Sequence, residues 1–288
     1  MSVVPLVPHD LRVGDRVLPT SRRCLVMGVV NVTPDSFSDG GRFLDPAAAV
    51  DHGLALVAEG ADLLDVGGES TRPGATDVPA AVELERVLPV VEELARTAGV
   101  PVSIDTRKAT VAEAALAAGA AMVNDVSAGR HDPDLLGVAA DAKVPLVLMH
   151  MLGTPATMQD DPRYDDVVAE VEEFLAERCR AAEAAGVDNQ ALVVDPGIGF
   201  GKRDQDNYAL LDQLARFTRL GHPVMVGTSR KAFIGRVLDS PADQRLEGTA
   251  ATVVWVVERG ARIVRVHDVA PMVGAVRMTE AMLRWGAT

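Results

Sequence analysis

The chain has 288 residues, of which 48% are hydrophobic and only 3% aromatic, so its core must be largely aliphatic. Its 28 basic and 41 acidic residues give a net charge of −13, which argues against general nucleic-acid binding and against an anionic membrane surface. We see no signal peptide or membrane-spanning stretch, and Cys24 and Cys179 make no disulfide framework. These features together predict a cytoplasmic protein.

The N-terminal segment, residues 1–24, contains a predicted β-hairpin. Polar and apolar residues alternate over 11–18 on both sides of Gly14 and Asp15, a pair that is typical of a tight turn. We expect this hairpin to plug the bottom of a single domain formed by residues 25–288.

Eight short apolar runs follow along the chain, and alanine-rich helical patterns fill most of the gaps between them. Eight buried strands that alternate with helices predict an α/β fold, a closed parallel (β/α)8 TIM barrel. The helical patterns cover 46–59, 82–98, 110–118, 133–142, 165–185, 207–217 and 248–258. The carboxyl ends of the strands would share one mouth, and the polar residues there are Asn31, Asp65, Asp105, Asn124, His150, Asp195, Thr228, Ser229 and His267.

Two polar segments at this end of the barrel are too rich in glycine and proline for regular structure. They cover residues 31–41 and 67–74. Long loops at the catalytic end of a compact barrel are usually lids or binding loops, so we expect both to contact a ligand.

Three strand ends favour a flat heterocyclic ligand. Asp105 and Asp195 supply acceptors, whereas Asn124 both donates and accepts, which suits the edge of a pterin or a guanine. A metal ion would also suit these groups, and spacing alone leaves both alternatives open. Asp65 is a weaker candidate, because the glycines after it suggest a role in the turn.

The last two strand ends favour an anion. Arg265 and His267 are two residues apart and so share a face of their strand. An arginine in an apolar strand is costly to bury unless it faces an anion or a core acid such as Asp268, and barrel phosphate sites favour this position. In the turn 227–231, Thr228 or Ser229 could cap the next helix, and Lys231 would point toward the mouth.

The helical segment 248–258 is apolar almost all round. Such a helix is buried on more than one side, which favours a homodimer contact through the C-terminal helices. The alternative is a helix that the chain's own termini cover.

Seven segments together resemble the dihydropteroate synthase family of folate biosynthesis. They are residues 27–41, 65–74, 103–106, 124–127, 195–202, 227–231 and 265–268. The resemblance implies a pterin-binding TIM-barrel transferase that condenses 6-hydroxymethyl-7,8-dihydropterin pyrophosphate with 4-aminobenzoate. The products would be 7,8-dihydropteroate and pyrophosphate, and sulfonamides would inhibit the reaction.

The resemblance also implies roles for individual residues. The pterin would contact Asp105, Asn124, Val126, Met149, Asp195, Phe200 and Lys231. The pyrophosphate would be bound by Asn31 through Mg2+, and by Thr71, Arg72, Arg265 and His267. The aminobenzoate pocket would be formed by Phe37, Pro73, Phe200 and Ser229. The catalytic residues would be Asp39, Arg72, Lys231 and Arg265.

The implied mechanism is an SN1-like loss of pyrophosphate beneath the two loops. Two alternatives share much of this sequence pattern, a pterin-binding methyltransferase barrel and an inactive pterin-binding paralogue. A methyltransferase has no diphosphate to hold, so Arg72, Arg265 and His267 argue against it, and Asp39 with Arg72 argues against an inactive paralogue.

Overall fold

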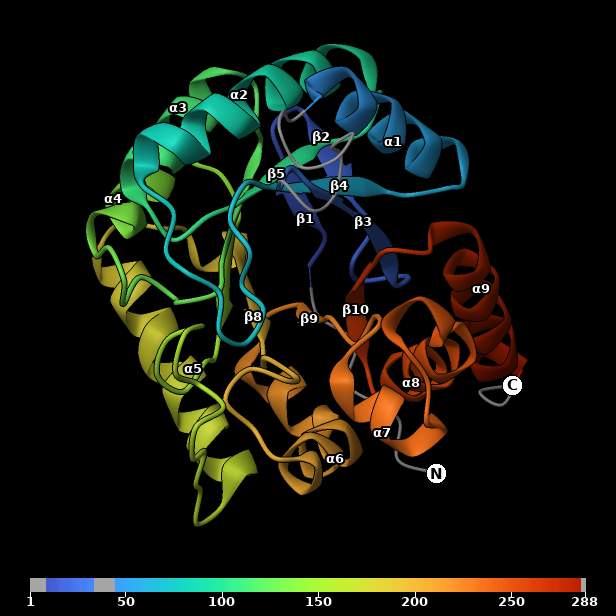
Figure 1. Ribbon diagram of the computed structural model, residues 1–288. Helices are drawn as coiled ribbons and strands as arrows, with labels where there is room; N and C mark the ends of the chain where they lie inside the picture. Colours follow the sequence, from blue (N-terminus) through green and yellow to red (C-terminus); the bar gives the residue numbers. More distant parts are fainter. Residues whose placement is uncertain (1–8, 34–44, 286–288) are drawn as a thin grey trace.

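The computed structural model describes residues 9–33 and 45–285, and it shows the predicted (β/α)8 barrel (Figure 1). Eight parallel strands close in the order β10-β3-β4-β5-β6-β7-β8-β9. Their bounds are β3 Leu25–Asn31, β4 Leu63–Gly67, β5 Val102–Asp105, β6 Met122–Asp125, β7 Leu146–Met149, β8 Leu192–Asp195, β9 Val224–Val226 and β10 Ala261–Val266. Most of the expected polar residues therefore lie at or just beyond the strand ends, whereas Asp65 is the middle residue of β4.

Helices form the outer layer around the strands (Figure 1). They are α1 Pro46–Ala58, α2 Ala80–Thr97, α3 Ala109–Ala117, α4 Asp134–Ala142, α5 Val167–Ala184, α6 Asp204–Asp212, α7 Ala232–Leu238, α8 Leu246–Glu258 and α9 Val269–Trp285, with short 3-10 helices η1 Asn189–Ala191, η2 Leu214–Leu220 and η3 Ala242–Gln244. Within the described residues, no helix is long and apolar enough to span a membrane.

One predicted helix is wrong in its extent. The segment 207–217 is not continuous, because α6 ends at Asp212 and the 3-10 helix η2 begins at Leu214. A 3-10 helix has three residues per turn and so places Leu214 and Phe217 on one face. Both side chains are fully buried there.

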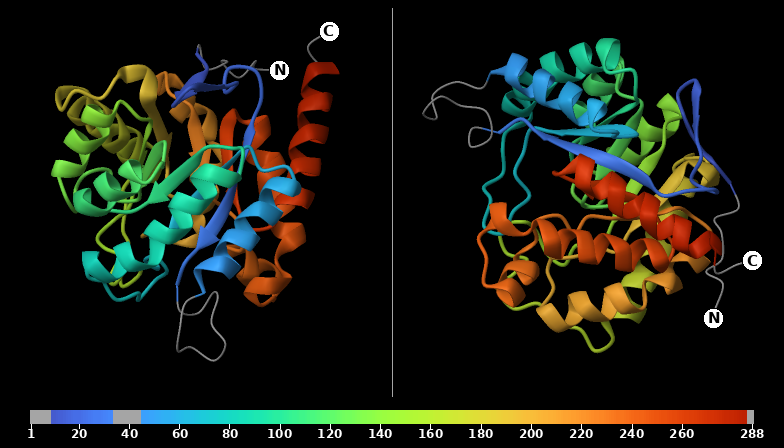
Figure 2. Two further views of the ribbon diagram at one scale, coloured as in Figure 1. Left: turned by 90° about the horizontal axis from the view of Figure 1, so that it is seen from above. Right: turned by 90° about the vertical axis from the view of Figure 1, so that its right-hand side faces the viewer.

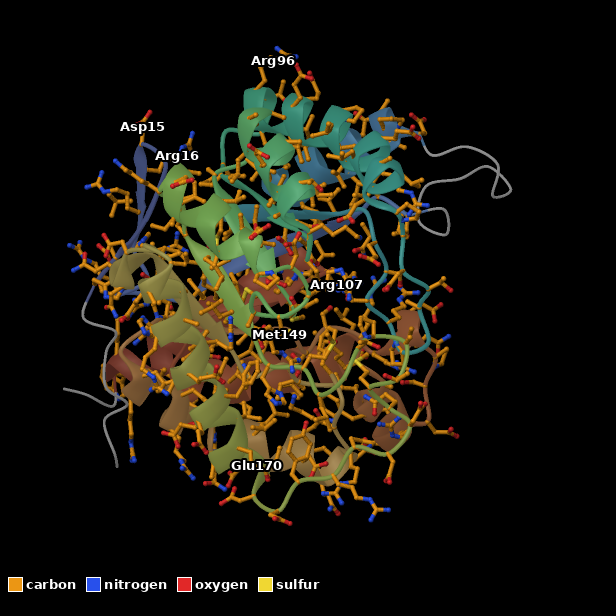
Figure 3. The ribbon with its side chains drawn as sticks, turned by 90° about the vertical axis from the view of Figure 1, so that its left-hand side faces the viewer. Asp15, Arg16, Arg96, Arg107, Met149 and Glu170 are labelled. Carbon is orange, nitrogen blue, oxygen red and sulfur yellow. The ribbon has the colours of Figure 1, made fainter. Side chains whose placement is uncertain are left out.

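The N-terminal hairpin lies at the closed end of the barrel, as predicted. Strands β1 Leu11–Val13 and β2 Arg16–Leu18 pair antiparallel around Gly14, which has a φ of +58°. Leu11 and Val13 are buried in one cluster with interior residues of the barrel strands. The hairpin tip, labelled at Asp15 and Arg16 in Figure 3, is at the opposite end from the segment that joins β4 to α2, as Figure 2 also shows.

Candidate active site at the barrel mouth

A hydrogen-bonded group of four side chains from four strands occupies the mouth. Arg265 of β10 donates from Nε to Asp65 Oδ2 at 2.6 Å and from Nη2 to Asp105 Oδ2 at 2.7 Å. Asn124 of β6 donates from Nδ2 to the same Asp65 oxygen at 2.9 Å. The barrel therefore brings together residues that lie up to 200 positions apart in the chain.

Asp65 is more than the turn residue that the sequence suggested. Its side chain is fully buried, and it joins Asn124 to Arg265 through one oxygen. Its second oxygen and Asn124 Oδ1 are buried without a hydrogen-bond partner among the described residues. Buried polar atoms are normally satisfied, so two such acceptors in one mouth point to a ligand that donates hydrogen bonds.

Arg265 adopts the second of the two arrangements considered from the sequence, because core acids pair with it. Those acids are Asp65 and Asp105, whereas Asp268 pairs with Arg230 at 2.5 Å. The side chain of Arg265 remains 21% exposed, so its outer edge is still accessible from the mouth.

Two carboxylates at the mouth are costly to ionise. Burial raises the pKa of Asp105 to about 7, although Arg265 opposes the rise, and burial raises the pKa of Asp195 to about 6. Asp195 Oδ1 accepts from the Gly197 backbone N–H at 2.7 Å. Gly197 has a φ of +67°, and a Cβ there would lie 1.9 Å from the His150 carbonyl oxygen, so only glycine fits this turn.

Lys231 lies next to the loop that follows β8. Its Nζ is 3.8 Å from the centroid of the Phe200 ring, and burial lowers its pKa to about 8. Phe200 packs against an apolar cluster formed by Val126, Met149, Met151 and Met158. The predicted pterin-slot residues Val126, Met149 and Phe200 therefore lie together, with Lys231 and its positive charge beside them.

The end of β10 meets the turn after β9. His267 Nδ1 is 3.0 Å from Ser229 Oγ, and the His267 backbone N–H donates to the same oxygen at 3.2 Å. Burial and nearby cations, Arg265 first among them, lower the pKa of His267 to about 3, so the imidazole is neutral. The expected helix cap is wrong, because Lys231 is the N-cap of α7 and no side chain caps it; Ser229 is engaged by His267 instead.

The loop between β4 and α2, residues 68–79, carries Thr71, Arg72 and Pro73. It crosses the open end of the barrel (Figures 1 and 2). The Gly74 N–H donates to the Pro155 carbonyl at 3.0 Å, so the loop touches the segment after β7. Phe37 and Asp39 lie outside the described residues.

Asn31 is the last residue of β3 and is half-buried at the mouth. Within the described ranges, no group of three or more His, Cys, Asp or Glu side chains could hold a metal ion. Asn31 offers a single amide oxygen, which fits Mg2+ only if a substrate and waters supply the other ligands, a common arrangement for this ion.

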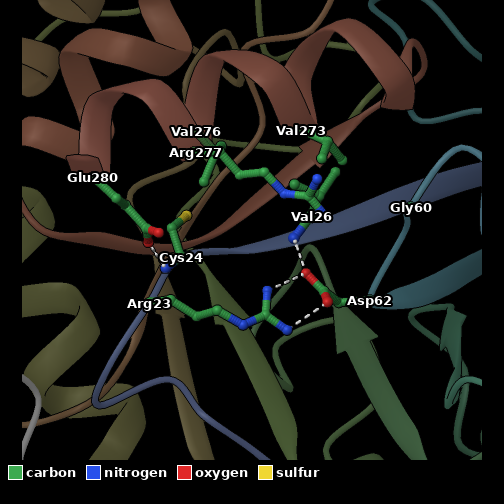
Figure 4. Close-up of a pocket in the computed structure, with 9 residues that line it drawn as sticks. All are labelled: Arg23, Cys24, Val26, Gly60, Asp62, Val273, Val276, Arg277 and Glu280. Atoms are coloured by element: carbon green, nitrogen blue, oxygen red, sulfur yellow. Dashed lines mark hydrogen bonds and ion pairs between the residues drawn. The ribbon is translucent and has the colours of Figure 1, made fainter. Parts of the chain in front are cut away.

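A separate pocket of about 220 Å3 lies at the other end of the strands (Figure 4). Its acids are already engaged, because Asp62 pairs with Arg23 at 2.6 Å and Glu280 accepts from the Cys24 N–H at 2.6 Å. Residues at the bottom of a TIM barrel usually serve stability. This pocket is therefore not the reaction site.

Some mouth residues were missed or undervalued in the sequence. Asp65 follows an apolar run like the other candidates, and this position was the only sequence signal for it, although in the structure it is the middle residue of β4. Met158 lies in a loop, far along the chain from Phe200 and Val126, and no sequence signal marks it. His150, also a strand end, packs its ring against Phe174 at 4.8 Å and contacts Lys202 Nζ at 2.9 Å, so it has a structural role.

Comparisons with known proteins identify the family of this chain. The family profile described as "Pterin binding enzyme" matches residues 27–267. The dihydropteroate synthase of Bacillus subtilis is 45% identical over 269 residues, which cover 93% of this chain and 92% of the relative.

Two solved structures are also similar. The Xanthomonas albilineans dihydropteroate synthase with 4-aminobenzoic acid has a TM-score of 0.89 at 52% identity, with 95% of this chain and 98% of that chain covered. The Yersinia pestis enzyme in a sulfonamide complex has a TM-score of 0.91 at 42% identity, with 96% and 99% covered. The chain therefore belongs to the dihydropteroate synthase family of pterin-binding enzymes.

Proposed function

We propose that the mouth of this barrel condenses 6-hydroxymethyl-7,8-dihydropterin pyrophosphate with 4-aminobenzoate to give 7,8-dihydropteroate and pyrophosphate. The observation that carries this proposal is the direct contact, at one mouth, between a strand-end acceptor and a strand-end cation. Asp105 accepts from Arg265 at 2.7 Å, and Asp195 and Lys231 attract each other electrostatically nearby. A ring with donor groups and a leaving anion can thus bind side by side.

The acceptors are suited to the pterin ring. Asp195 would accept from the ring's amino–imino edge, and the unpartnered oxygen of Asn124 would accept a further hydrogen bond. Lys231 would donate to an acceptor of the ring, and Asp105 would accept from a donor of the ring. The apolar faces of the ring would lie against Val126, Met149 and Phe200.

The cations are suited to the diphosphate. Arg265 and Arg72 would form charged hydrogen bonds to its oxygens, with Thr71 and the neutral His267 as further donors. Mg2+, when bound through Asn31 and the substrate, would stabilise the leaving oxygen as a Lewis acid. These groups stabilise negative charge that grows as the carbon–oxygen bond breaks.

The reaction would then proceed by an SN1-like route. The bond between the pterin methylene and the diphosphate oxygen breaks first, and positive charge on the carbon is stabilised by Asp39, Asp105 and Asp195. The arylamine attacks as its free base, forms the carbon–nitrogen bond and loses a proton to solvent, so no strong base is needed. Because water would trap such an electrophile, the loops 31–41 and 67–74 are expected to close before reaction.

The aminobenzoate would bind against Phe37, Pro73, Phe200 and Ser229. The relatives solved with 4-aminobenzoic acid and with a sulfonamide support this part of the proposal. Sulfonamides are therefore expected to compete with 4-aminobenzoate. Inhibition that excess 4-aminobenzoate fails to relieve would contradict a shared pocket.

Pyrophosphate release tests the proposed activity most directly. The protein is mixed with both substrates, with and without Mg2+, and pyrophosphate and dihydropteroate are measured together. Equal amounts of the two products, dependent on Mg2+, would support the proposal. A methyltransferase or an inactive pterin-binding paralogue would form neither product.

The C-terminal helices are the proposed dimer interface. The outer surfaces of α8 and α9 expose Trp255, Met278 and Met282 at 46%, 59% and 52%, an unusual apolar content for a monomer's surface. The inner face of α8 packs into the core through residues such as Val253 and Val256. Met278→Lys should shift a dimer to a monomer in analytical ultracentrifugation.

The buried free thiols of Cys24 and Cys179 support a reducing, cytoplasmic location.

A further inference from the structure

The loop 68–79 is fastened to the end of β5 by an almost fully buried set of ion pairs. Glu69 accepts from Arg107 Nη2 through Oε1 at 2.9 Å and from Lys108 Nζ through Oε2 at 2.8 Å. Lys108 Nζ also donates to Glu83 Oε2 at 2.5 Å. Exposures of these side chains are 5% for Glu69, 3% for Arg107, 13% for Lys108 and 0% for Glu83. We call these four residues the loop anchor.

The loop anchor joins the two stems of the loop. Glu69 lies at the start of the loop, and its Oε1 also accepts from the Val78 backbone N–H, at the end of the loop, at 3.1 Å. Arg107 Nη2 donates to Asp77 Oδ1 at 3.0 Å, on the same returning stem. Residues 70–76, which include Thr71 and Arg72, thus project as a short tip from a fixed base.

The base of the loop is coupled to the strand that carries a pterin-binding candidate. Arg107 and Lys108 follow Asp105 by two and three residues. The Lys108 N–H donates to Thr106 Oγ1 at 3.3 Å and the Ala109 N–H donates to Asp132 Oδ2 at 2.8 Å, so this short segment has its own hydrogen-bond framework. Arg107 is labelled in Figure 3, on the side of the barrel formed by α3, α4 and α5.

The charge content of the loop anchor favours a role in positioning. Two carboxylates balance two cations, so the group is neutral as a whole. Buried ion pairs add little net stability, because the cost of removing the charges from water offsets their attraction. Such a group instead fixes the orientation of the loop, because each hydrogen bond requires one arrangement of the two stems.

We propose that Glu69 and Arg107 are positioning residues that hold Thr71 and Arg72 over the diphosphate at a set distance from Asp105. This inference rests on the proposed function of the mouth. Neither residue touches substrate; both act through the loop. Loss of either contact should therefore weaken binding of the diphosphate much more than binding of the pterin ring.

The test compares Glu69→Gln, Arg107→Gln and the double variant with the wild-type protein. Arg216→Gln is the matched control, because it breaks a partly buried arginine–glutamate pair, with Glu172, between α5 and η2. Three quantities are measured: amide exchange in residues 69–79, affinity for 6-hydroxymethyl-7,8-dihydropterin without diphosphate, and kcat and KM with the diphosphate substrate.

We expect amide exchange at Val78 to rise roughly tenfold or more in both single variants, because each substitution weakens the ion pairs that hold the acceptor side chain of residue 69 in place. Catalytic efficiency should fall about 10- to 100-fold, the scale of a misplaced binding group. Affinity for the pterin alone should change less than about twofold. The catalytic efficiency of the double variant should be no lower than that of the less active single variant, because both substitutions disrupt the same ion pair. Arg216→Gln should leave all three quantities unchanged.

Equal losses for the pterin and for its diphosphate would overturn the proposal, because they would indicate a general structural role. Unchanged exchange in residues 69–79 would also overturn it. If Glu69→Gln does not fold, a variant that combines Glu69→Gln with Lys108→Met replaces it in the same comparison, because it removes one charge of each sign. A wild-type protein that releases no pyrophosphate would refute the proposed function, whereas the exchange measurement would still decide whether the loop anchor orders the loop.

Discussion

Asp195→Asn should make the protein more stable and, at the same time, impair its binding of pterin. Asp195 is buried at the mouth, and burial raises its pKa to about 6 from an ordinary value of 3.8. Asparagine has nearly the same shape and keeps an oxygen that can accept from the Gly197 N–H. The substitution therefore removes the charge with little change in packing.

The sign and size follow from the linkage of protonation to folding. Below pH 3.8 the carboxyl is protonated in both states and contributes nothing. Between pH 3.8 and about 6 folding takes up a proton, so stability falls as the pH rises, and above about 6 the loss is complete. At 1.36 kcal/mol per pKa unit the loss has an upper limit of about 3 kcal/mol. We expect the variant to be more stable by about 1–3 kcal/mol at pH 8 and equally stable at pH 3.5.

Urea unfolding of both proteins between pH 3.5 and 8 measures this difference. Asp204→Asn is the control of opposite sign, because the hydrogen bond from Arg236 lowers the pKa of Asp204, so its removal should reduce stability at pH 8. A stabilisation by Asp195→Asn that does not depend on pH, or a destabilisation at pH 8, would refute the reasoning.

The same substitution should weaken binding of the pterin. One charged hydrogen bond contributes about 1.5–3 kcal/mol, which corresponds to roughly 10- to 150-fold in affinity. Titration calorimetry with the pterin checks this value, and unchanged affinity would contradict the assignment of Asp195 to the ring. Together the two measurements would show that the charge of Asp195 lowers the stability of the fold but strengthens the binding of pterin.

Three further changes test other parts of the site. Lys231→Ala should reduce transition-state stabilisation, as measured from kcat/KM, by about 1.5–3 kcal/mol. The wild-type kcat/KM should decline as the pH rises through about 8, where Lys231 loses its proton, and a flat pH profile would argue against a charged Lys231. Gly197→Ala should destabilise the fold by at least about 2 kcal/mol in thermal unfolding, because its Cβ would meet the His150 carbonyl, and a neutral effect would contradict the close approach. Deletion of residues 71–73 should abolish product formation but leave pterin binding largely intact, whereas equal loss of both would contradict the role of this loop.

Much of the site could be predicted because a parallel barrel places every strand end at the same mouth. Asp105, Asn124 and Asp195 needed only their position after an apolar run to be recognised as candidates. The partner of each group could not be predicted in this way. Arg265 pairs with Asp65 and Asp105 because closure of the barrel brings β10, β4 and β5 together around one mouth, and their spacing along the chain contains no such information.

Local patterns of apolar and polar residues were enough to predict the alternation of buried strands and helices, the hairpin turn at Gly14 and the types of side chain at the mouth. The pairing of each acid with its base, the shift of each pKa by burial, and the ion pair of Glu69 with Arg107 emerged only from the folded arrangement. Those properties depend on distance and on exclusion of water, and both arise when segments far apart in the chain pack against one another.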